Sequence, residues 1–181
     1  MTPRFDPTKA ILFDLARGQM RDDEGNARLN LPAALLVRLC EQAGPAAAQD
    51  FAQSLGSDVG RRIESRLGQH IKTASLEEWT DHLGGQLALL GLGDLSVERW
   101  GQALTFVVSS APAGCTTFIG QLLGAALQRA LARQVELVAF AEQSITKYLL
   151  VAPDTAAKVS ALVQSGQGIG QVVEQLKQGA A

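Results

Sequence analysis

Few residues in this sequence have the types and spacing that catalysis or metal binding requires. The two histidines, His70 and His82, have no other candidate ligand near them in the sequence. Asp81 precedes His82, but neighbouring side chains on a helix point about 100° apart and do not form a catalytic dyad. Ser109 and Ser110 lack the glycine-serine-glycine elbow of a hydrolase and an assignable histidine base. We therefore expect both histidines at the surface, no catalytic residue, no metal site and no cofactor.

Other residues could hold a ligand without reacting with it. Trp79 and Trp100 could form the walls of an apolar pocket, with Cys115 and Phe118 beside them. Packing in the hydrophobic core explains Trp79 equally well. Cys40 and Cys115 lie in apolar surroundings without a Cys-x-x-Cys spacing, which favours buried free thiols over a disulfide or a ligand role. Free thiols suit a reducing compartment.

Four arginines form the nearest approach to a basic cluster. They are Arg61, Arg62, Arg66 and Arg99. Arg62 and Arg66 share a helix face because they are four residues apart. The cluster could bind an anionic ligand or pair with carboxylates, but we favour ordinary solvated arginines.

The composition limits the partners of the chain. Its 181 residues carry a formal charge of −2, so no basic field attracts nucleic acid. Hydrophobic residues make up 46% and charged residues 19%, an apolar excess that favours a homo-oligomer. No segment approaches the ~18 uninterrupted apolar residues of a membrane helix, and the acidic N-terminus does not match a signal peptide. We expect a cytoplasmic protein without an integral membrane segment.

The first third of the chain is predicted to form a hairpin and two helices. Within residues 9–31, two short apolar segments, 10–13 and 29–31, flank the polar segment 20–28, which is rich in turn-forming residues. This pattern predicts a β-hairpin with its turn in the polar segment. Proline at the start and glycine at the end predict a short helix over 32–43, and a longer helix follows over 45–67. The core-facing side of the longer helix is predicted to carry Phe51, Leu55, Val59 and Ile63.

Small residues form a second stripe along this longer helix. The stripe consists of Ala48, Ala52, Gly56 and Gly60, and Gly120 and Gly124 repeat its spacing later in the chain. Each glycine costs a helix about 1 kcal/mol relative to alanine, so close packing is the expected compensation. We expect the two glycine faces to cross each other or to form a subunit interface. The alternative is that Gly56 marks a kink between two shorter helices.

The rest of the chain is predicted to alternate helices and strand pairs. Ser75 and Glu78 form a capping box that begins a helix. Strands are predicted over 94–100, 103–110, 135–142 and 145–152, and between the two pairs a helix over 116–131 that Thr116 or Thr117 can cap. These elements predict an α+β fold, in which an antiparallel sheet of about four strands plus the N-terminal hairpin is layered with helices. Residues 1–153 are expected to form a single domain, and residues 154–181 a helical or partly disordered tail.

Five stretches of the sequence together resemble a known family. They are LGSDVGRRI, SLEEWTDHLGGQLALLGLGDLSVE, LTFVVSSAP, CTTFIGQLLGAALQRALARQVELVAFAE and YLLVAP. In this order they are similar to the 4-vinyl reductase domain, which is related to the fold of the transport-particle (TRAPP) subunits, over roughly residues 10–152. Members of that family that bind small molecules commonly have a hydrophobic cavity, and many hold zinc through cysteines. Cys115 stands at a matching cysteine position, but AFAEQSITKY stands where the later cysteines are expected.

The segment 55–98 also resembles the D component of bacterial cellulose synthase through the phrases VGRRI and LALLGLGDLSVE. That component is noncatalytic, assembles into rings and organises glucan export. The absence of assignable catalytic groups and the apolar excess favour a noncatalytic homo-oligomeric domain, a dimer or higher, that binds a ligand or serves as a scaffold, and the resemblances imply that it is bacterial. The alternatives are an assembly factor for polysaccharide export, like that cellulose synthase component, and a sensor of an apolar or tetrapyrrole-like small molecule. An enzyme that reduces a vinyl group is the least favoured hypothesis, because no proton donor or cofactor loop can be named.

Overall fold

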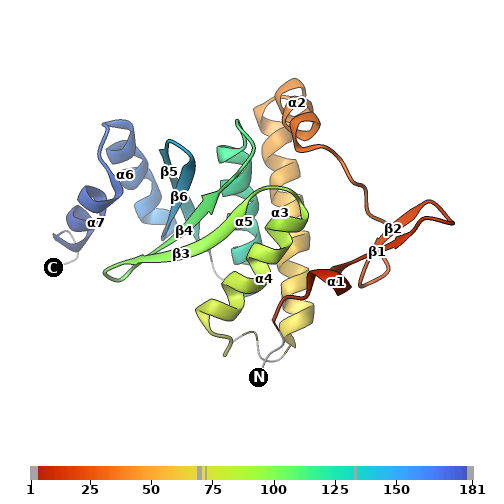
Figure 1. Cartoon of the computed structure of the whole chain (residues 1–181). Helices are drawn as coiled ribbons and strands as arrows, with labels where there is room; N and C mark the ends of the chain where they lie inside the picture. The colour runs from red at the N-terminus through yellow and green to blue at the C-terminus, as the bar shows by residue number, and fades with distance from the viewer. Residues whose placement is uncertain (1–3, 69–70, 72, 133, 179–181) are drawn as a thin grey trace.

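The structure is a computed structural model and describes residues 4–68, 71, 73–132 and 134–178 (Figure 1). It is a mixed α+β fold, as the sequence predicts. In chain order its elements are α1 (Pro7–Ala10), β1 (Ile11–Asp14), β2 (Gln19–Asp22), α2 (Ala33–Ala43), α3 (Pro45–Leu67), α4 (Leu76–Leu89), β3 (Asp94–Trp100), β4 (Ala103–Ser109), α5 (Thr116–Leu131), β5 (Glu136–Glu142), β6 (Ile145–Val151), α6 (Pro153–Gln164) and α7 (Ile169–Gln178).

The main sheet has four antiparallel strands in the order β3-β4-β6-β5. Both predicted strand pairs are present, and the pairing of β4 with β6 joins them into one sheet. β4 is central and reads ALTFVVS, a run of β-branched and aromatic residues that suits a strand buried on both faces. β3 and β5 are the edges. The tight turn between β3 and β4 is at Gly101, whose positive φ of 66° glycine adopts without strain.

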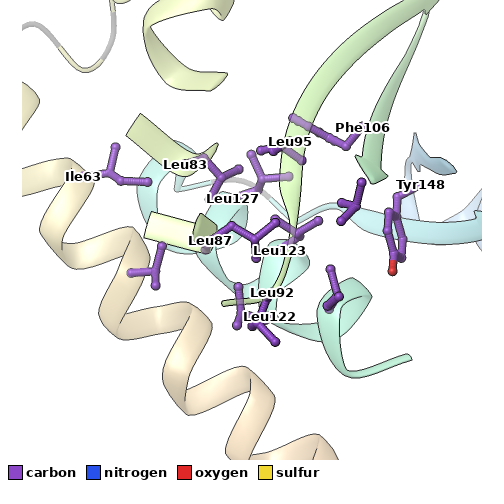
Figure 2. Close-up of a cluster of buried hydrophobic side chains, with 14 of the residues drawn as sticks. Ile63, Leu83, Leu87, Leu92, Leu95, Phe106, Leu122, Leu123, Leu127 and Tyr148 are labelled. Carbon is purple, nitrogen blue, oxygen red and sulfur yellow. The ribbon is translucent and has the colours of Figure 1, made fainter. Parts of the chain in front are cut away.

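Helices cover both faces of this sheet (Figure 1). Neighbouring residues on β6 point to opposite faces, and both are buried: Tyr148 belongs to the larger core cluster and Leu149 to the smaller one. The larger cluster joins one face to α3, α4 and α5 (Figure 2), where Leu83, Leu87 and Leu123 meet. This cluster is the main hydrophobic core.

The smaller cluster lies beneath α6 and α7, in the segment for which the sequence predicts a helical or partly disordered tail. Residues 153–178 form two helices, and Val159 and Val172 are fully buried against the sheet. The sheet contributes Val138, Phe140, Leu149 and Val151 to this cluster. The two helices therefore supply the apolar cover for the outer face of the sheet.

α3 is one continuous helix of 23 residues, so the alternative of a kink at Gly56 is wrong. A Cβ atom on Gly56 would overlap the carbonyl of Leu122, and one on Gly60 would lie 2.6 Å from the carbonyl of Ala126. The backbones of α3 and α5 therefore touch at these two glycines. The surface of α3 at Gly56 and Gly60 is covered by the same chain and is not open to another subunit.

The glycines of α5 do not take part in this crossing. Gly120 lies against the ring of Tyr148, where an added Cβ would come 3.1 Å from Cε1, and Gly124 has open space beside it. The expectation that two glycine faces cross is therefore wrong on the α5 side. Alanines at positions 125 and 126 provide the close approach instead.

The N-terminal hairpin is present, but the predicted position of its turn is wrong. β1 pairs with β2 in residues 11–22, and the turn falls at 15–18, where Gly18 has a φ of 62°. The polar run after β2 folds separately, because the Asp22 carboxylate accepts hydrogen bonds from the N–H groups of Glu24 (3.1 Å) and Asn26 (2.8 Å). Residues 29–31 form no strand.

Two helix predictions have different outcomes. The capping box of α4 is confirmed, since Ser75 and Glu78 exchange backbone-to-side-chain hydrogen bonds of 2.8 and 3.2 Å. α5 has Cys115 at its N-cap position without a side-chain cap, so neither threonine of residues 116–117 caps it. Both threonines are already inside the first turn.

Candidate functional site

An apolar pocket of about 390 Å³ lies where α2, the start of α3 and the start of α5 meet. Cys115 and Phe118, two of the four predicted pocket residues, line this hollow. Cys40 joins them from the end of α2. The remaining apolar lining comes from Leu36, Val37, Pro45 and Ala48. Its volume lies within the range of small-molecule sites, and its walls are mostly carbon and sulfur.

The two tryptophans do not line this pocket. Trp79 is buried in the main core beneath α4. Trp100 lies with the smaller cluster on the opposite face of the sheet. Its ring centre is 5.3 Å from Lys147 Nζ, and its Nε1–H donates a hydrogen bond of 3.1 Å to Glu98. The packing interpretation of Trp79 therefore fits the structure, and the fluorescence of neither residue reports directly on the pocket.

Both cysteines are free thiols. Cys115 is buried, and its pKa is raised by burial and, to a smaller extent, by the neighbouring Cys40. Cys40 is half-buried, and burial raises its pKa as well. The neutral thiol is therefore favoured at pH 7, and neutral thiols are poor nucleophiles. Within the described ranges no group of three or more His, Cys, Asp or Glu residues could hold a metal ion. The pair is suited to line an apolar wall.

The contribution of α2 to this pocket is not among the sequence predictions. Leu36 and Cys40 are four residues apart and so share one face of the helix. That spacing identifies which face of α2 is turned inward. It does not show that the start of α5, more than seventy positions later, lies opposite.

A second hollow, of about 620 Å³, lies beside Gly120 and Gly124 between α3, α5 and the start of β5. It is polar, and its lining includes five glutamines: Gln49, Gln53, Gln121, Gln128 and Gln134. Gln53 donates a hydrogen bond of 3.2 Å to Gln121 across the two helices. The space beside the Gly120/Gly124 face is thus an open polar hollow in the single chain.

The arginines of α3 pair with carboxylates, so the prediction of solvated arginines is wrong. Arg62 is 4% exposed and binds Asp58 one turn earlier and Gln86 of α4, the latter at 3.1 Å. Arg61 binds Glu24 at 2.8 Å, and Arg66 binds Asp23 at 2.6 Å. Arg99 lies apart from them, on β3.

These pairs attach the turn after the hairpin to α3. Asp22 is 1% exposed and accepts from Arg28 at 2.6 Å. Burial favours a raised pKa for Asp22, but the hydrogen bonds from Asn26 and Arg28 outweigh it and hold the pKa below its ordinary value. The same balance of burial against two arginines lowers the pKa of Asp58. We call the paired residues of the 22–28 turn and α3 the ionic clamp.

Large apolar side chains are exposed on the N-terminal part of the chain, which we call the N-terminal apolar surface. Its members are Leu12, Phe13, Leu15, Leu29, Leu31, Leu35, Leu39 and Phe51. Leu15 is 88% and Leu29 82% exposed, and no residue of α2 is fully buried. Phe51, predicted in the core, is 46% exposed. Figure 1 shows the hairpin projecting from the body of the molecule.

One of the two histidines, His82, does not lie where the sequence predicts. His82 is 4% exposed on the inner side of α4, with its ring 6.2 Å from that of Phe5 in an edge-on contact. The prediction of a surface position is wrong because Phe5 folds back over this helix. His70 lies outside the described residues.

Comparison with known proteins adds no family to these observations. No protein-family model matches the chain, and no curated protein sequence matches it. Among the helices of the described ranges, none is both long and apolar enough to cross a membrane.

Proposed function

We propose that this chain is a noncatalytic, homo-oligomeric scaffolding domain that assembles through the N-terminal apolar surface. The observation that supports the proposal is that eight of the ten exposed large apolar side chains in the described residues lie within residues 12–51, on the hairpin, the 29–31 linker, α2 and the start of α3. Exposed large apolar side chains are ordinary when scattered singly, but a concentration of them in one part of a chain is typical of interaction sites. The assembly surface is therefore the hairpin, the 29–31 linker and α2, in place of the helix glycines.

The hairpin is suited to reach a second copy. It stands away from the core while the ionic clamp holds its base on α3 through the pairs Arg61–Glu24 and Arg66–Asp23. A base fixed in this way presents the apolar side chains of residues 12–15 in a defined direction and lowers the entropy lost on association. The proposal agrees with the resemblance to the 4-vinyl reductase and TRAPP-like proteins and, in its assembly role, to the D component of bacterial cellulose synthase. It places the domain in the cytoplasm.

Replacing Leu35 with glutamate is expected to convert the oligomer to a monomer. Leu35 is 45% exposed on α2, so the charge enters the proposed interface without entering the core. A buried unpaired carboxylate at an interface costs several kcal/mol, enough to lower affinity more than about a hundredfold. Light scattering coupled to size-exclusion chromatography measures the mass of each variant.

Leu131→Glu is the matched control, because Leu131 is 43% exposed at the end of α5 and outside the apolar surface. It should leave the mass of the wild type unchanged. A wild type that is monomeric at micromolar concentration would refute the assembly proposal, and so would equal effects of the two variants.

A second candidate function is a sensor for an apolar small molecule, which the pocket at Cys40, Cys115 and Phe118 supports. The fluorescence of N-phenyl-1-naphthylamine, a neutral apolar probe, should rise on binding. Ala48→Phe fills the pocket and should abolish the rise, whereas Ala47→Phe, exposed one position earlier and outside the lining, should preserve it. An unchanged signal in Ala48→Phe would show that the dye binds elsewhere. Mass spectrometry of the natively purified protein measures the mass of any bound molecule and so tests whether the natural ligand is tetrapyrrole-like.

A further inference from the structure

A hollow lies along one edge of the sheet. It has a volume of about 960 Å³ and runs between α4 and the edge strand β3, from Phe5 to Arg99. β3 pairs with β4 on one side, and none of the strands in the described part of the chain pairs with its other side. Backbone N–H and C=O groups on the open side of an edge strand are ready to pair with another chain. We call this hollow the β3 trough.

The α4 wall of the trough has little side-chain bulk. Gly84, Gly85 and Ala88 line it: a Cβ atom on Gly84 would touch Leu95 of β3 at 3.4 Å and the Phe5 ring fills the space at Gly85, while Ala88 is exposed and leaves its end of the trough open. An extended chain needs this kind of space, because alternate side chains of an added strand must point toward the helix. Bulky residues at these positions of α4 would fill the trough.

The chain itself shows how an extended segment is held at one end of the trough. The Phe5 N–H donates a 2.6 Å hydrogen bond to Asp81 Oδ2, and the Phe5 ring lies directly on Gly85, in the space that a Cβ atom would need. Arg66 covers the ring, with its guanidinium carbon 5.2 Å from the ring centre. A backbone N–H on a carboxylate and a side chain on a glycine surface therefore already occur here.

The charges of the trough indicate the chemistry of the missing occupant. Glu77 and Asp81 on α4 and Asp94 on β3 contribute three carboxylates, against the guanidinium of Arg99 in the lining and that of Arg66 over the Phe5 ring. A segment with basic residues complements this net negative charge, and an acidic segment is repelled. Two copies of the same acidic trough facing each other would also repel, which disfavours pairing of β3 with β3 of a second copy.

We propose that β3 binds an extended segment of a different protein, with alternating apolar and basic residues, which adds to the sheet as a fifth strand. Its backbone pairs with the open side of β3, its apolar side chains lie over Gly84 and Ala88, and its basic side chains, on the opposite face of the added strand, lie on the side of Asp94, within the negative field to which Glu77 also contributes. In strand addition the backbone hydrogen bonds supply affinity and the pockets for alternate side chains supply specificity. This site is separate from the N-terminal apolar surface and does not depend on it.

The test uses a fluorescein-labelled heptapeptide of alternating valine and lysine as the probe, added to the full chain. Fluorescence anisotropy measures binding, and amide hydrogen exchange measures protection of residues 95–99. We expect binding with slowed exchange in β3. A peptide with glutamate in place of lysine, and a lysine peptide with a central proline that cannot pair its backbone, should each bind at least about tenfold more weakly.

Ala88→Trp tests the location, because Ala88 is exposed and lines the trough. It should weaken binding of the lysine peptide at least about tenfold. Ala157→Trp, at an alanine on α6 that is also exposed and lies outside the trough, is the matched control and should bind like the wild type. The double variant Glu77→Gln, Asp94→Asn should bind about fivefold more weakly at low salt.

Three outcomes would overturn the proposal. The first is no binding of the lysine peptide, and the second is equal binding of the proline peptide, which would reduce the effect to charge alone. The third is protection of β3 that rises with protein concentration without any peptide, which would assign the edge to a second copy. None of these depends on whether Leu35→Glu changes the oligomeric state.

Discussion

Gly56→Ala is expected to destabilise the fold by about 2–3 kcal/mol, although alanine is the better helix former by about 1 kcal/mol. The added methyl group would overlap the Leu122 carbonyl and lie 2.9 Å from the Cβ of Ala125. Both groups belong to the backbone or the first side-chain atom of α5, so neither can move away without shifting the helix. Since α3 and α5 build the main core together, that shift would open the core. Urea unfolding followed by circular dichroism measures the loss.

Gly124→Ala provides the control within the same pair of helices. Gly124 is buried in α5, yet an added Cβ meets nothing within 4 Å. Its replacement should therefore be neutral or stabilise the protein by up to about 1 kcal/mol through helix propensity. Equal losses in the two variants would show that helix backbone flexibility, and not contact across the crossing, explains the glycine in α3.

The sequence is a good guide to elements whose determinants are local. Hydrophobic spacing, the Ser75/Glu78 capping box and the glycine turns place α2 to α5 and all four strands of the main sheet close to their observed bounds. These signals depend on residues within a few positions of each other. The α+β class follows from them because alternating strand pairs and amphipathic helices have few ways to cover their apolar faces.

Features that depend on contacts between distant segments are harder to predict. The residues from Asp22 to Asn26 are turn formers in any context, so the sequence favours the hairpin turn at this position. They do form a turn, but it follows the hairpin and is held to α3 by the ion pair between Glu24 and Arg61. A surface position is the natural prediction for His82, because nothing near it in the sequence shows that Phe5 folds over it. In both cases the deciding partner is more than thirty residues away.

The candidate pocket shows the same division. Cys115 and Phe118 can be identified from the sequence because the start of α5 carries them three residues apart, close to one helix face. Trp79 and Trp100 share only their residue type with this set, and they lie on opposite faces of the sheet. The face on which a side chain lies depends on strand register and helix packing, and neither follows from residue type.

Asp58→Ala should destabilise the protein by about 2–3 kcal/mol, because removing one partner of a buried ion pair leaves the other charge uncompensated. Asp58 pairs with Arg61, with Arg62 and, at 3.8 Å, with Arg28. Without Asp58, the buried Arg62 keeps its hydrogen bond of 3.1 Å to the neutral Gln86 but loses its carboxylate partner. The expected loss is below the full value for a buried pair, since the Asp58 side chain is 38% exposed. Because the variant also loosens the ionic clamp, hydrogen exchange in residues 19–28 should become faster.

Glu64→Ala separates this effect from the loss of any carboxylate on α3. Glu64 pairs with Arg129 at 3.4 Å, but both side chains are about half exposed, 49% and 54%, so its removal should cost less than about 0.5 kcal/mol. Combining Asp58→Ala with Arg62→Leu should recover part of the lost stability, because the buried charge goes with its partner. The loss in unfolding free energy of the double variant is compared with the sum of the losses of Asp58→Ala and Arg62→Leu. If the two values are equal, the residues act independently and the buried pair is not the cause of the instability.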